Sequence, residues 1–313
     1  MKWQAADELD LCVCVPARNE AARLEILLAA LAEQNWPAPV KVVIAVNNSS
    51  DDSLDRLARA QAFHAGRIAV HALNLTFCDR LAHAGSARRA AMEAGLRLLL
   101  VPSRGILLST DADTRPPSEW LANNVAAIRR GADIVGGKIE IEGSEMLPGP
   151  VGKLHTAWER YWEAVRAIED AVDPIPWDAP PRHGDHTGAS LAIRADLYDA
   201  CGGVPLLPTG EDRELVRAAV AQGGRLAHPP DVFTFVSPRR EGRATGGMAA
   251  AMDNLFALAS KGEVPRAPSF RHWHERAAWR RRLRSMPQGQ RLIALGEPLL
   301  GPMPHDMTLE VLS

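Results

Sequence analysis

The sequence predicts an α/β fold built on a mainly parallel sheet that is covered by helices on both faces. Short apolar runs, such as LCVCVP at 11–16 and VKVVIAV at 40–46, have the length and composition of buried strands. Segments with leucines at helical spacing alternate with these runs over about the first 115 residues. The chain of 313 residues, with 46% apolar and 24% charged residues, has the balance of a globular protein.

The predicted elements follow one another in a strand-helix order. Asn19 is a suitable cap for the first helix, and Pro16 is expected to stop the first strand. The predicted strands are 11–16, 40–46, 67–73, 132–142, GASLAI at 188–193 and DVFTFV at 231–236, and GILLSTDAD at 105–113 is predicted as a strand that runs into a loop. The predicted helices are the segment after Asn19, the segment through Leu54 and Leu57, Gly85 to Leu99, 151–170 and 211–222. A loop rich in Pro, His and Asp is expected at 173–187.

Bulk properties exclude some classes of protein. The formal net charge of −2 argues against a nucleic-acid-binding protein, which usually has a strongly basic face. The first ten residues, MKWQAADELD, lack the apolar core of a signal peptide, and no stretch approaches the roughly 18 apolar residues of a membrane span. We therefore expect a cytoplasmic protein. The arginine-rich segment 271–284 leaves a peripheral membrane contact open, although a solvated helix face is favoured.

Polar turns follow three of the predicted strands, after Val15, Val46 and Leu108. The carboxyl ends of parallel strands meet at one edge of a sheet, and ligands of open α/β sheets bind there. We therefore expect one shared crevice lined by Arg18, Asn19, Asn47, Asn48, Asp111 and Asp113.

The sharpest chemical motif is Asp111-Ala112-Asp113, directly after the apolar run ILLST. Alternate carboxylates at the end of a buried strand can hold a divalent ion, because Mg²⁺ and Mn²⁺ prefer oxygen ligands. An Asx turn with a solvated acid is the alternative, since Pro116 and Pro117 follow. The position of the motif at a strand end favours the metal site.

A second acidic motif is Gly210-Glu211-Asp212. Transfer to a hydroxyl group needs a carboxylate that accepts the proton of the acceptor, and this motif offers one. Thr209 and Asp212 also have the spacing of a helix capping box, and acids stabilise the first turn of a helix. The two interpretations are compatible.

Two further groups of polar side chains are candidates for ligand contacts. Arginines on a loop close to glycines can fold over a diphosphate and stabilise it as a leaving group, with a solvated loop as the alternative. These arginines are Arg239, Arg240 and Arg243. His228 is a candidate metal ligand, although a structural role before Pro229 is favoured. The last group consists of His183, Asp185 and His186. These residues do not make a complete zinc ligand set, so we expect them to contact the acceptor or the sugar.

The sequence resembles family 2 glycosyltransferases in five segments that come in the same order. The segments are VPARNEAARLEILLAAL, VVIAVNNSSDDS, ILLSTDAD, GASLAIRADLY and GEDREL, and the resemblance covers roughly residues 10–260. It implies a GT-A-like single domain, in which a nucleotide-binding half with a mainly parallel sheet is merged with a smaller acceptor-binding half. It also implies an inverting transfer from a UDP- or GDP-sugar, assisted by a divalent metal ion (Mn²⁺ or Mg²⁺), to an acceptor that the sequence does not identify.

The resemblance also implies roles for single residues. Asp111 would contact the ribose and Asp113 the metal, and Asp212, or Glu211 beside it, would be the general base. The other implied donor contacts are Pro16, Arg18, Glu20, Asn47, Asn48 and Arg88. The adjacent asparagines depart from the family, which usually has an acidic pair touching the base of the nucleotide. Because an Asn side chain both donates and accepts, uridine and guanosine stay open.

We divide the chain by expected role into a nucleotide-sugar-binding half at 1–130, an acceptor-binding and catalytic half at 131–260 and a C-terminal helical or irregular tail at 261–313.

Two alternative functions share parts of this pattern of motifs. A sugar-nucleotide nucleotidyltransferase normally has a glycine-rich loop after its first strand, and PARNEA contains no glycine. A non-catalytic sugar-nucleotide-binding protein would have a degenerate D-x-D motif or no base, and both motifs are present here.

Overall fold

Two compact units make up the structure, which is a computed structural model that describes residues 9–141, 147–236 and 248–311. The first unit takes Met1–Glu140 and Asp185–Val236, and the second takes Ile141–Gly184 and Ser237–Ser313. The division by role at residues 130 and 260 rests on a different criterion and stays a prediction.

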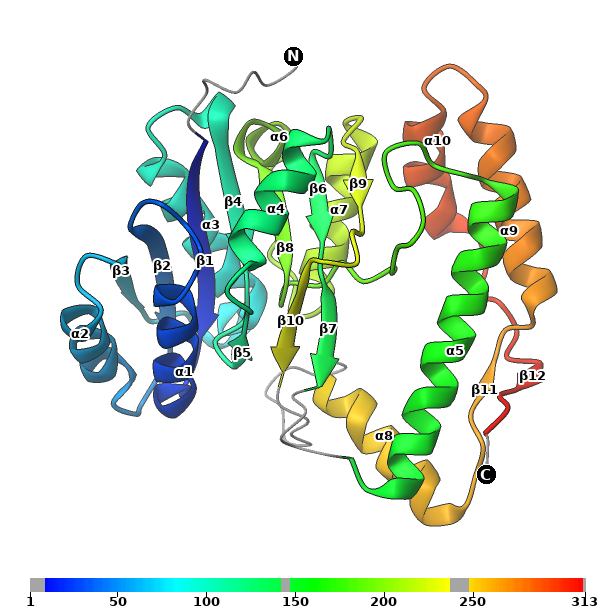
Figure 1. Cartoon of the computed structure of the whole chain (residues 1–313), viewed down its shortest axis with the longest axis horizontal. Coiled ribbons are helices and arrows are strands. Elements are labelled where there is room, and N and C mark those ends of the chain that lie inside the picture. Colours follow the sequence, from blue (N-terminus) through cyan, green and yellow to red (C-terminus); the bar gives the residue numbers. More distant parts are fainter. Residues whose placement is uncertain (1–8, 142–146, 237–247, 312–313) are drawn as a thin grey trace. The chain divides into compact units, whose positions relative to one another are not determined.

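The first unit is built on a seven-stranded sheet with the strand order β3-β2-β1-β4-β8-β6-β9 (Figure 1). Its strands are β1 (Asp10–Ala17), β2 (Val40–Asn47), β3 (Ile68–Leu75), β4 (Gly105–Ser109), β6 (Ile134–Gly136), β8 (Leu191–Arg194) and β9 (Leu226–Ala227). The pairs β1–β2, β1–β4, β2–β3 and β6–β9 are parallel, and only β8 runs antiparallel to its neighbours β4 and β6. The predicted mainly parallel α/β sheet is confirmed.

Helices cover both faces of this sheet (Figure 1). They are α1 (Ala21–Ala32), α2 (Ser53–Phe63), α3 (Ala84–Leu98), α4 (Trp120–Arg129), α6 (Ala195–Ala200) and α7 (Glu211–Ala221), with short 3-10 turns η1 (Asp79–Leu81) and η2 (Pro102–Arg104). Alternate residues of β1 serve the two faces: Val13 and Val15 pack in the cluster that includes α1 and α4, and Cys12 and Cys14 pack with α3. Helix α3 approaches closely because Gly95 has no Cβ, which would lie 2.6 Å from Cys14 Sγ.

Two details of the first unit differ from the sequence prediction. The single strand expected at 132–142 is wrong, because the chain forms β6 and then β7 (Lys138–Ile141), which belongs to a separate three-stranded sheet. That sheet has the order β5-β10-β7, with β5 at Thr114–Arg115 and β10 at Phe233–Val236. The expected stop at Pro16 is also wrong. The pairing of β1 with β4 ends at Cys14 and Ser109. Pro16, which has no N–H to donate, therefore removes no hydrogen bond between β1 and β4.

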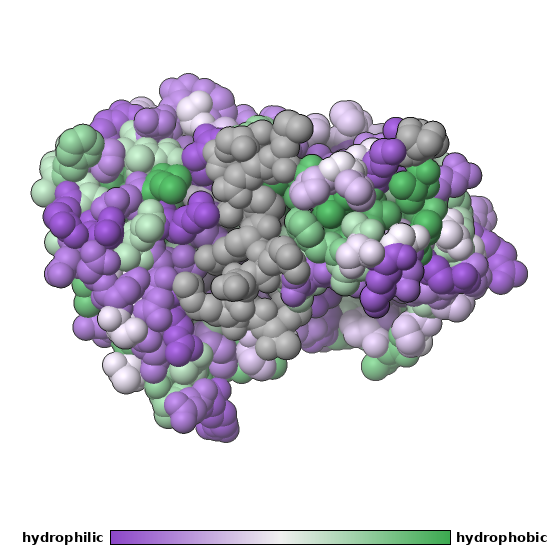
Figure 2. All heavy atoms as spheres, turned by 90° about the horizontal axis from the view of Figure 1, so that it is seen from below, coloured by the Kyte–Doolittle hydropathy of each residue, from purple (hydrophilic) through white to green (hydrophobic). Residues whose placement is uncertain are grey.

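The second unit is mainly helical. Its elements are α5 (Gly149–Val172), α8 (Met248–Lys261), α9 (Phe270–Arg284), α10 (Gly289–Gly296), the 3-10 turn η3 (Glu297–Leu299), β11 (Arg266–Ala267) and β12 (Met307–Thr308). Tyr161 and Val165 on α5 are buried in one apolar cluster, with Trp273 of α9 packed against it. Apolar side chains also gather on the surface of this unit that carries α8 (Figure 2). Among the described residues, we find no helix with the length and apolar character needed to cross a membrane.

Candidate active site

The loops after β1 and β2 are tied together at the carboxyl edge of the sheet. Asn19 has a φ of 51°, its N–H donates to Ser49 Oγ at 2.9 Å, and its Oδ1 accepts from the N–H of Ser50 at 2.8 Å. The N–H of Ala21, the first residue of α1, donates to Asp51 Oδ2 at 3.1 Å. The predicted helix cap at Asn19 is therefore wrong, because its side chain serves the neighbouring loop and Asp51 binds the helix end.

Three of the predicted donor contacts lie at the end of β1 and in the loop after it. Pro16 and Glu20 are buried, whereas Arg18 is exposed. Arg18 Nη1 donates to the carbonyl of Ala82 at 3.2 Å, which links this loop to the segment before α3. Of these three side chains, Arg18 is therefore the one most open to a ligand.

The two asparagines after β2 differ in their surroundings. Asn47 is the last residue of β2 and is buried. Asn48 has a φ of 48°, its Nδ2 donates to the carbonyl of Phe77 at 2.9 Å, and its Oδ1 accepts from the N–H of Phe77 at 3.0 Å. Asn48 therefore holds the segment after β3 with both ends of its amide. A contact from Asn48 to a base would use only the remaining N–H or lone pair.

The centre of the candidate site is Arg88 on α3, whose side chain is only 5% exposed. Its Nε donates to Glu211 Oε1 at 3.0 Å, and its Nη2 donates to Asp111 Oδ1 at 2.9 Å. Its Nη1 donates to Ser109 Oγ at 2.6 Å and to the carbonyl of Gly188 at 3.0 Å. One guanidinium therefore joins the end of β4, the segment before β8 and the start of α7. These hydrogen bonds go to the protein, and the donor contact expected of Arg88 stays a prediction.

The charges around Arg88 are unequally exposed. Burial lowers the pKa of the Arg88 guanidinium, but the negative charges of Asp111, Glu211 and Asp212 outweigh burial, so this pKa lies above its ordinary value. The side chain of Glu211 is 7% exposed and that of Asp111 is 37% exposed. Glu211 is thus enclosed with its cation, while Asp111 keeps an open side toward solvent.

The peptide of Gly188 connects this network to Asp212. The N–H of Gly188 donates to Asp212 Oδ2 at 2.7 Å, and its carbonyl accepts from Arg88 and, at 2.9 Å, from the hydroxyl of Ser109. A Cβ at position 188 would lie 2.3 Å from Arg88 Cζ, so any side chain here would displace the guanidinium. The orientation of the Asp212 carboxylate therefore depends on a peptide that Arg88 and Ser109 hold.

The start of α7 does not have the predicted capping box. The residue before the helix is Gly210, with a φ of 73°, and it makes no side-chain cap. Besides the bond from Gly188, Asp212 accepts from the N–H of Arg213 at its Oδ1, at 2.8 Å. The half-buried Asp212 is therefore held at the first turn of α7 without the participation of Thr209 that a capping box would need.

The Asp111-Asp113 turn is held by hydroxyl groups on either side of it. Thr110 Oγ1 and Thr114 Oγ1 lie 2.7 Å apart, and Thr114 Oγ1 donates to the carbonyl of Asp111 at 2.9 Å. Asp111 and Asp113 are both partly exposed. In the part of the chain that the structure describes, no three His, Cys, Asp or Glu side chains gather as a metal site. The turn still fits Mg²⁺ or Mn²⁺, since such ions commonly use one or two carboxylates together with water and substrate phosphates.

The histidines and Asp185 are divided between the two units. His183 belongs to the second unit, and the others belong to the first. His186 Nδ1 and His228 Nε2 lie 3.4 Å apart, so a predicted acceptor contact and a predicted metal ligand are neighbours. The N–H of Ile139 donates to Asp185 Oδ2 at 3.3 Å, which places this acid beside β7. The predicted arginine loop, with Arg239, Arg240 and Arg243, lies outside the described residues.

Sequence reasoning missed Ser109 and Gly188, which complete the Arg88 network. Ser109 is a fully buried hydroxyl at the end of the apolar β4, and a polar residue at that place in ILLST is a usable signal. Gly188 opens the segment GASLAI, and nothing in its sequence neighbourhood indicates that Arg88 lies against it. The contact joins residues that are 100 positions apart in the chain.

The seven-stranded, mainly parallel sheet with helices on both faces is that of the GT-A fold. The chain belongs to glycosyl transferase family 2, whose family model matches residues 12–178, more than half of the chain. This family and the GT-A fold are those that the sequence resemblance implied.

One curated relative is the glycosyltransferase AglE of Haloferax volcanii, which is 30% identical over 223 residues. The match covers 71% of this chain and 64% of the relative's length. Two solved structures have the same fold at 18% identity. A mannosyltransferase of Pyrobaculum calidifontis, in complex with GDP-Man and Mn²⁺, has a TM-score of 0.52 over 94% of this chain and 81% of its own. S. aureus TarS 1-349, in complex with UDP-GlcNAc, has a TM-score of 0.51 over 92% and 80%.

Proposed function

We propose that the protein is an inverting glycosyltransferase that moves a sugar from a nucleoside-diphosphate sugar to a hydroxyl group of an acceptor, with the help of a divalent metal ion. The observation that carries this proposal is the Arg88 network. Arg88 binds Asp111 of the first acidic motif and Glu211 of the second, and the Gly188 peptide links it to Asp212. The residues proposed for the donor site and the residue proposed as the base are therefore joined by one hydrogen-bond network, which supports the proposal.

Asp212 is the general base of the proposed reaction. Glu211, the other candidate, is 7% exposed and ion-paired with Arg88, so it is better suited to hold Arg88 than to accept a proton. The Asp212 carboxylate takes the acceptor proton while the acceptor oxygen attacks the anomeric carbon from the face opposite the diphosphate. One such displacement inverts the configuration at that carbon.

The donor end of the proposed site is built from oxygen ligands and arginines. Asp113, with His228 as a further candidate, would hold the Mn²⁺ or Mg²⁺ ion, which supplies positive charge opposite the leaving diphosphate. Asp111 keeps its open side for the ribose. The other proposed donor contacts are Pro16, Arg18, Glu20, Asn47, Asn48, Arg88, Arg239, Arg240 and Arg243. UDP- and GDP-sugars are both candidate donors, since TarS and the mannosyltransferase were solved with UDP-GlcNAc and GDP-Man respectively.

The acceptor side is proposed to include His183, Asp185 and His186. His186, a proposed acceptor residue, lies next to His228, a proposed metal ligand, and this supports an acceptor site close to the metal. A cytoplasmic location, expected from the sequence, is part of the same proposal.

The test is turnover of a panel of UDP- and GDP-sugars with and without EDTA, using the wild type and Asp113→Ala. We expect release of nucleoside diphosphate, which EDTA stops and excess Mn²⁺ restores, and almost no release by Asp113→Ala at an unchanged melting temperature. Nuclear magnetic resonance of the product should show an inverted anomeric centre. Exchange of pyrophosphate would indicate a nucleotidyltransferase, and donor binding without any release would indicate a non-catalytic binding protein. Either result would overturn the proposal.

A further inference from the structure

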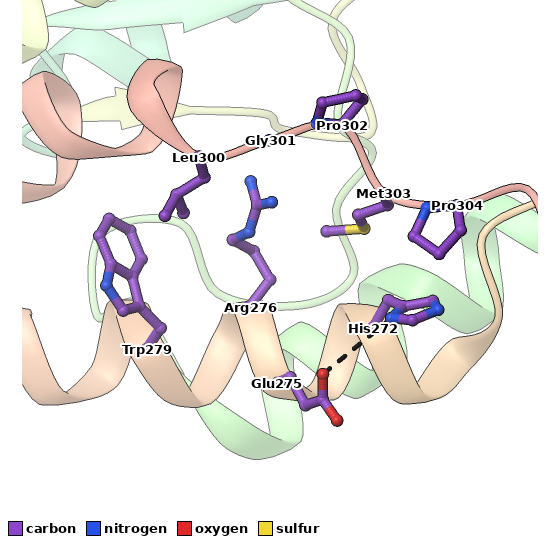
Figure 3. Close-up of a pocket in the computed structure, with 9 residues that line it drawn as sticks. All are labelled: His272, Glu275, Arg276, Trp279, Leu300, Gly301, Pro302, Met303 and Pro304. Carbon is purple, nitrogen blue, oxygen red and sulfur yellow. Dashed lines mark ion pairs between the residues drawn. The ribbon is translucent and has the colours of Figure 1, made fainter.

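The second unit contains two neighbouring cavities of about 350 and 360 Å³. They lie between α5, α9 and the segment that follows η3, and we call them together the α5–α9 groove. The residues that line both cavities are Arg276, Leu300, Gly301, Pro302 and Met303. Figure 3 shows Arg276 rising from α9 between Trp279 and His272, with its guanidinium directed toward the Leu300–Pro302 segment.

Aromatic rings form one wall of the groove. Trp158, Tyr161, Trp162 and Trp273 all line the larger cavity. The polar atoms of two of them are used internally, since Trp273 Nε1 donates to Tyr161 Oη, which in turn donates to the carbonyl of Pro268 at 2.9 Å. Trp162 is 43% exposed. The wall therefore offers apolar ring surface and few groups that could bind a hydrogen-bonding ligand.

The charged side chains of the groove differ between its two cavities. Arg276 and His305 are the basic residues that line the larger cavity, and no carboxylate lines it. The carboxylate of Glu275 lines the smaller cavity, where it lies 3.8 Å from Arg271 Nε and 4.0 Å from His272 Nδ1. Arg276 Nη1 lies 3.5 Å from Glu297 Oε1, but Glu297 makes its closer contacts with Arg280, whose Nε lies 3.0 Å from the same oxygen. Glu297 is thus shared between two arginines, and the charge of Arg276 is only partly neutralised.

We propose that the α5–α9 groove binds an apolar molecule that carries one anionic group, with the apolar body on the rings and the anion at Arg276. A neutral sugar would find few hydrogen-bond partners along this wall. A small anion alone would leave the ring surface in water, where burial of apolar area is the main source of affinity. This ligand class is not that of the nucleotide-sugar donor, and the inference does not depend on the proposed reaction.

The test is binding of octyl phosphate to the full chain, below the concentration at which it forms micelles. Octanol and inorganic phosphate serve as the apolar and anionic parts alone, and octyl glucoside as the neutral sugar counterpart. Titration calorimetry and tryptophan fluorescence measure the affinities. We expect octyl phosphate to bind at least about tenfold more tightly than each of the other three, because both parts of the groove are used. Equal or tighter binding of octyl glucoside would overturn the proposal.

Variants locate the binding in the groove. Arg276→Gln should weaken octyl phosphate about tenfold and leave octanol unchanged, whereas Trp162→Ala should weaken both. Arg271→Gln is the matched control, because Arg271 lies on the same helix with its side chain 74% exposed and does not line either cavity. If Arg276→Gln fails to fold, Arg276→Lys keeps the charge and should retain binding. Unchanged octyl phosphate affinity in a folded Arg276→Gln protein would contradict the assignment.

Discussion

Each unit contains a network of ion pairs around arginines, and the two networks differ in what they leave open. In the first unit, Arg88 binds Asp111, whose side chain remains 37% exposed. In the second unit, Arg182 and Arg280 both bind Glu169, at 3.4 and 2.7 Å, and the side chain of Glu169 is only 6% exposed. Arginine–carboxylate ion pairs therefore lie at a solvent-exposed edge in the first unit and in a closed interior in the second.

Two further acids of the second unit and Asp212 of the first show the same difference. In the second unit, Asp173 and Asp178 have side chains that are 3% exposed, and they are paired with Arg284 and Arg182. In the first unit, the half-buried Asp212 accepts a hydrogen bond from the Gly188 peptide, and its charge acts on the nearby Arg88 guanidinium. An ion network that encloses its central acids serves the fold, whereas one that holds acids at a solvent edge can act on a ligand. Strong pairing alone does not distinguish the two cases.

The largest effect is expected from Arg88→Met. This variant leaves Glu211 buried without its cation and releases Asp111 and the Gly188 peptide. We expect the free energy of unfolding to fall by about 3–5 kcal/mol and turnover to be lost even in the folded fraction. Urea unfolding and donor turnover at 15 °C measure both.

The neighbouring residue provides the control for that experiment. Arg89 has a side chain 34% exposed and pairs with Glu93 one turn later on α3. Arg89 Nη1 also donates to the carbonyl of Val204 at 2.8 Å, so Arg89→Met should cost about 1–2 kcal/mol and keep turnover. Equal losses of unfolding free energy and turnover in Arg88→Met and Arg89→Met would contradict the central role of Arg88 in the network.

A smaller loss, confined to stability, is expected from Glu169→Gln. Three arginines then lose the carboxylate between them, so the free energy of unfolding should fall by about 3 kcal/mol. Turnover per folded molecule should stay normal, because the network is enclosed in the second unit. Glu163→Gln, an exposed position on the same helix, should change neither property. Loss of turnover in a folded Glu169→Gln protein would break the distinction between the two networks.

The first network was partly predictable from the sequence, and the second was not. Asp111, Glu211 and Asp212 stand in short motifs at the ends of predicted elements, so each could be singled out alone. Their connection depends on the contacts of Arg88 with Glu211 and Gly188, which lie 123 and 100 positions away in the chain and which local patterns do not encode. The pairs between α5 and α9 join residues 111 positions apart.

Local geometry explains the smaller errors. Asn19 looks like a helix cap, but its left-handed backbone turns its side chain to the loop after β2. The run at 132–142 looks like one strand, but the pairing changes at Gly137, where a Cβ would lie 2.0 Å from Ser190 Oγ. In both cases a tertiary neighbour decided the local structure.

The contribution of Glu169 to the stability of the second unit should depend modestly on pH. Burial raises the pKa of the Glu169 carboxyl, but Arg166, Arg280 and Arg182 outweigh it, so the pKa lies below 4.5 in the folded state. A lowered folded-state pKa contributes stability above the unfolded value, and this contribution is lost as the pH falls through the folded value. The difference in unfolding free energy between wild type and Glu169→Gln should therefore shrink below pH 4.5, by at most about 1.4 kcal/mol per pH unit. Urea unfolding of both proteins from pH 7 to pH 3 measures it, and a constant difference would contradict the assignment.

The most direct test of the central claim is the turnover of Asp212→Asn at saturating donor. The amide keeps the shape of Asp212 and an oxygen for the Gly188 N–H, but it cannot accept the acceptor proton. We expect turnover to fall roughly 10²–10⁴-fold, with the donor dissociation constant and the melting temperature close to those of the wild type. Near-normal turnover with a lowered melting temperature would show that Asp212 only supports the start of α7, and that the base lies elsewhere.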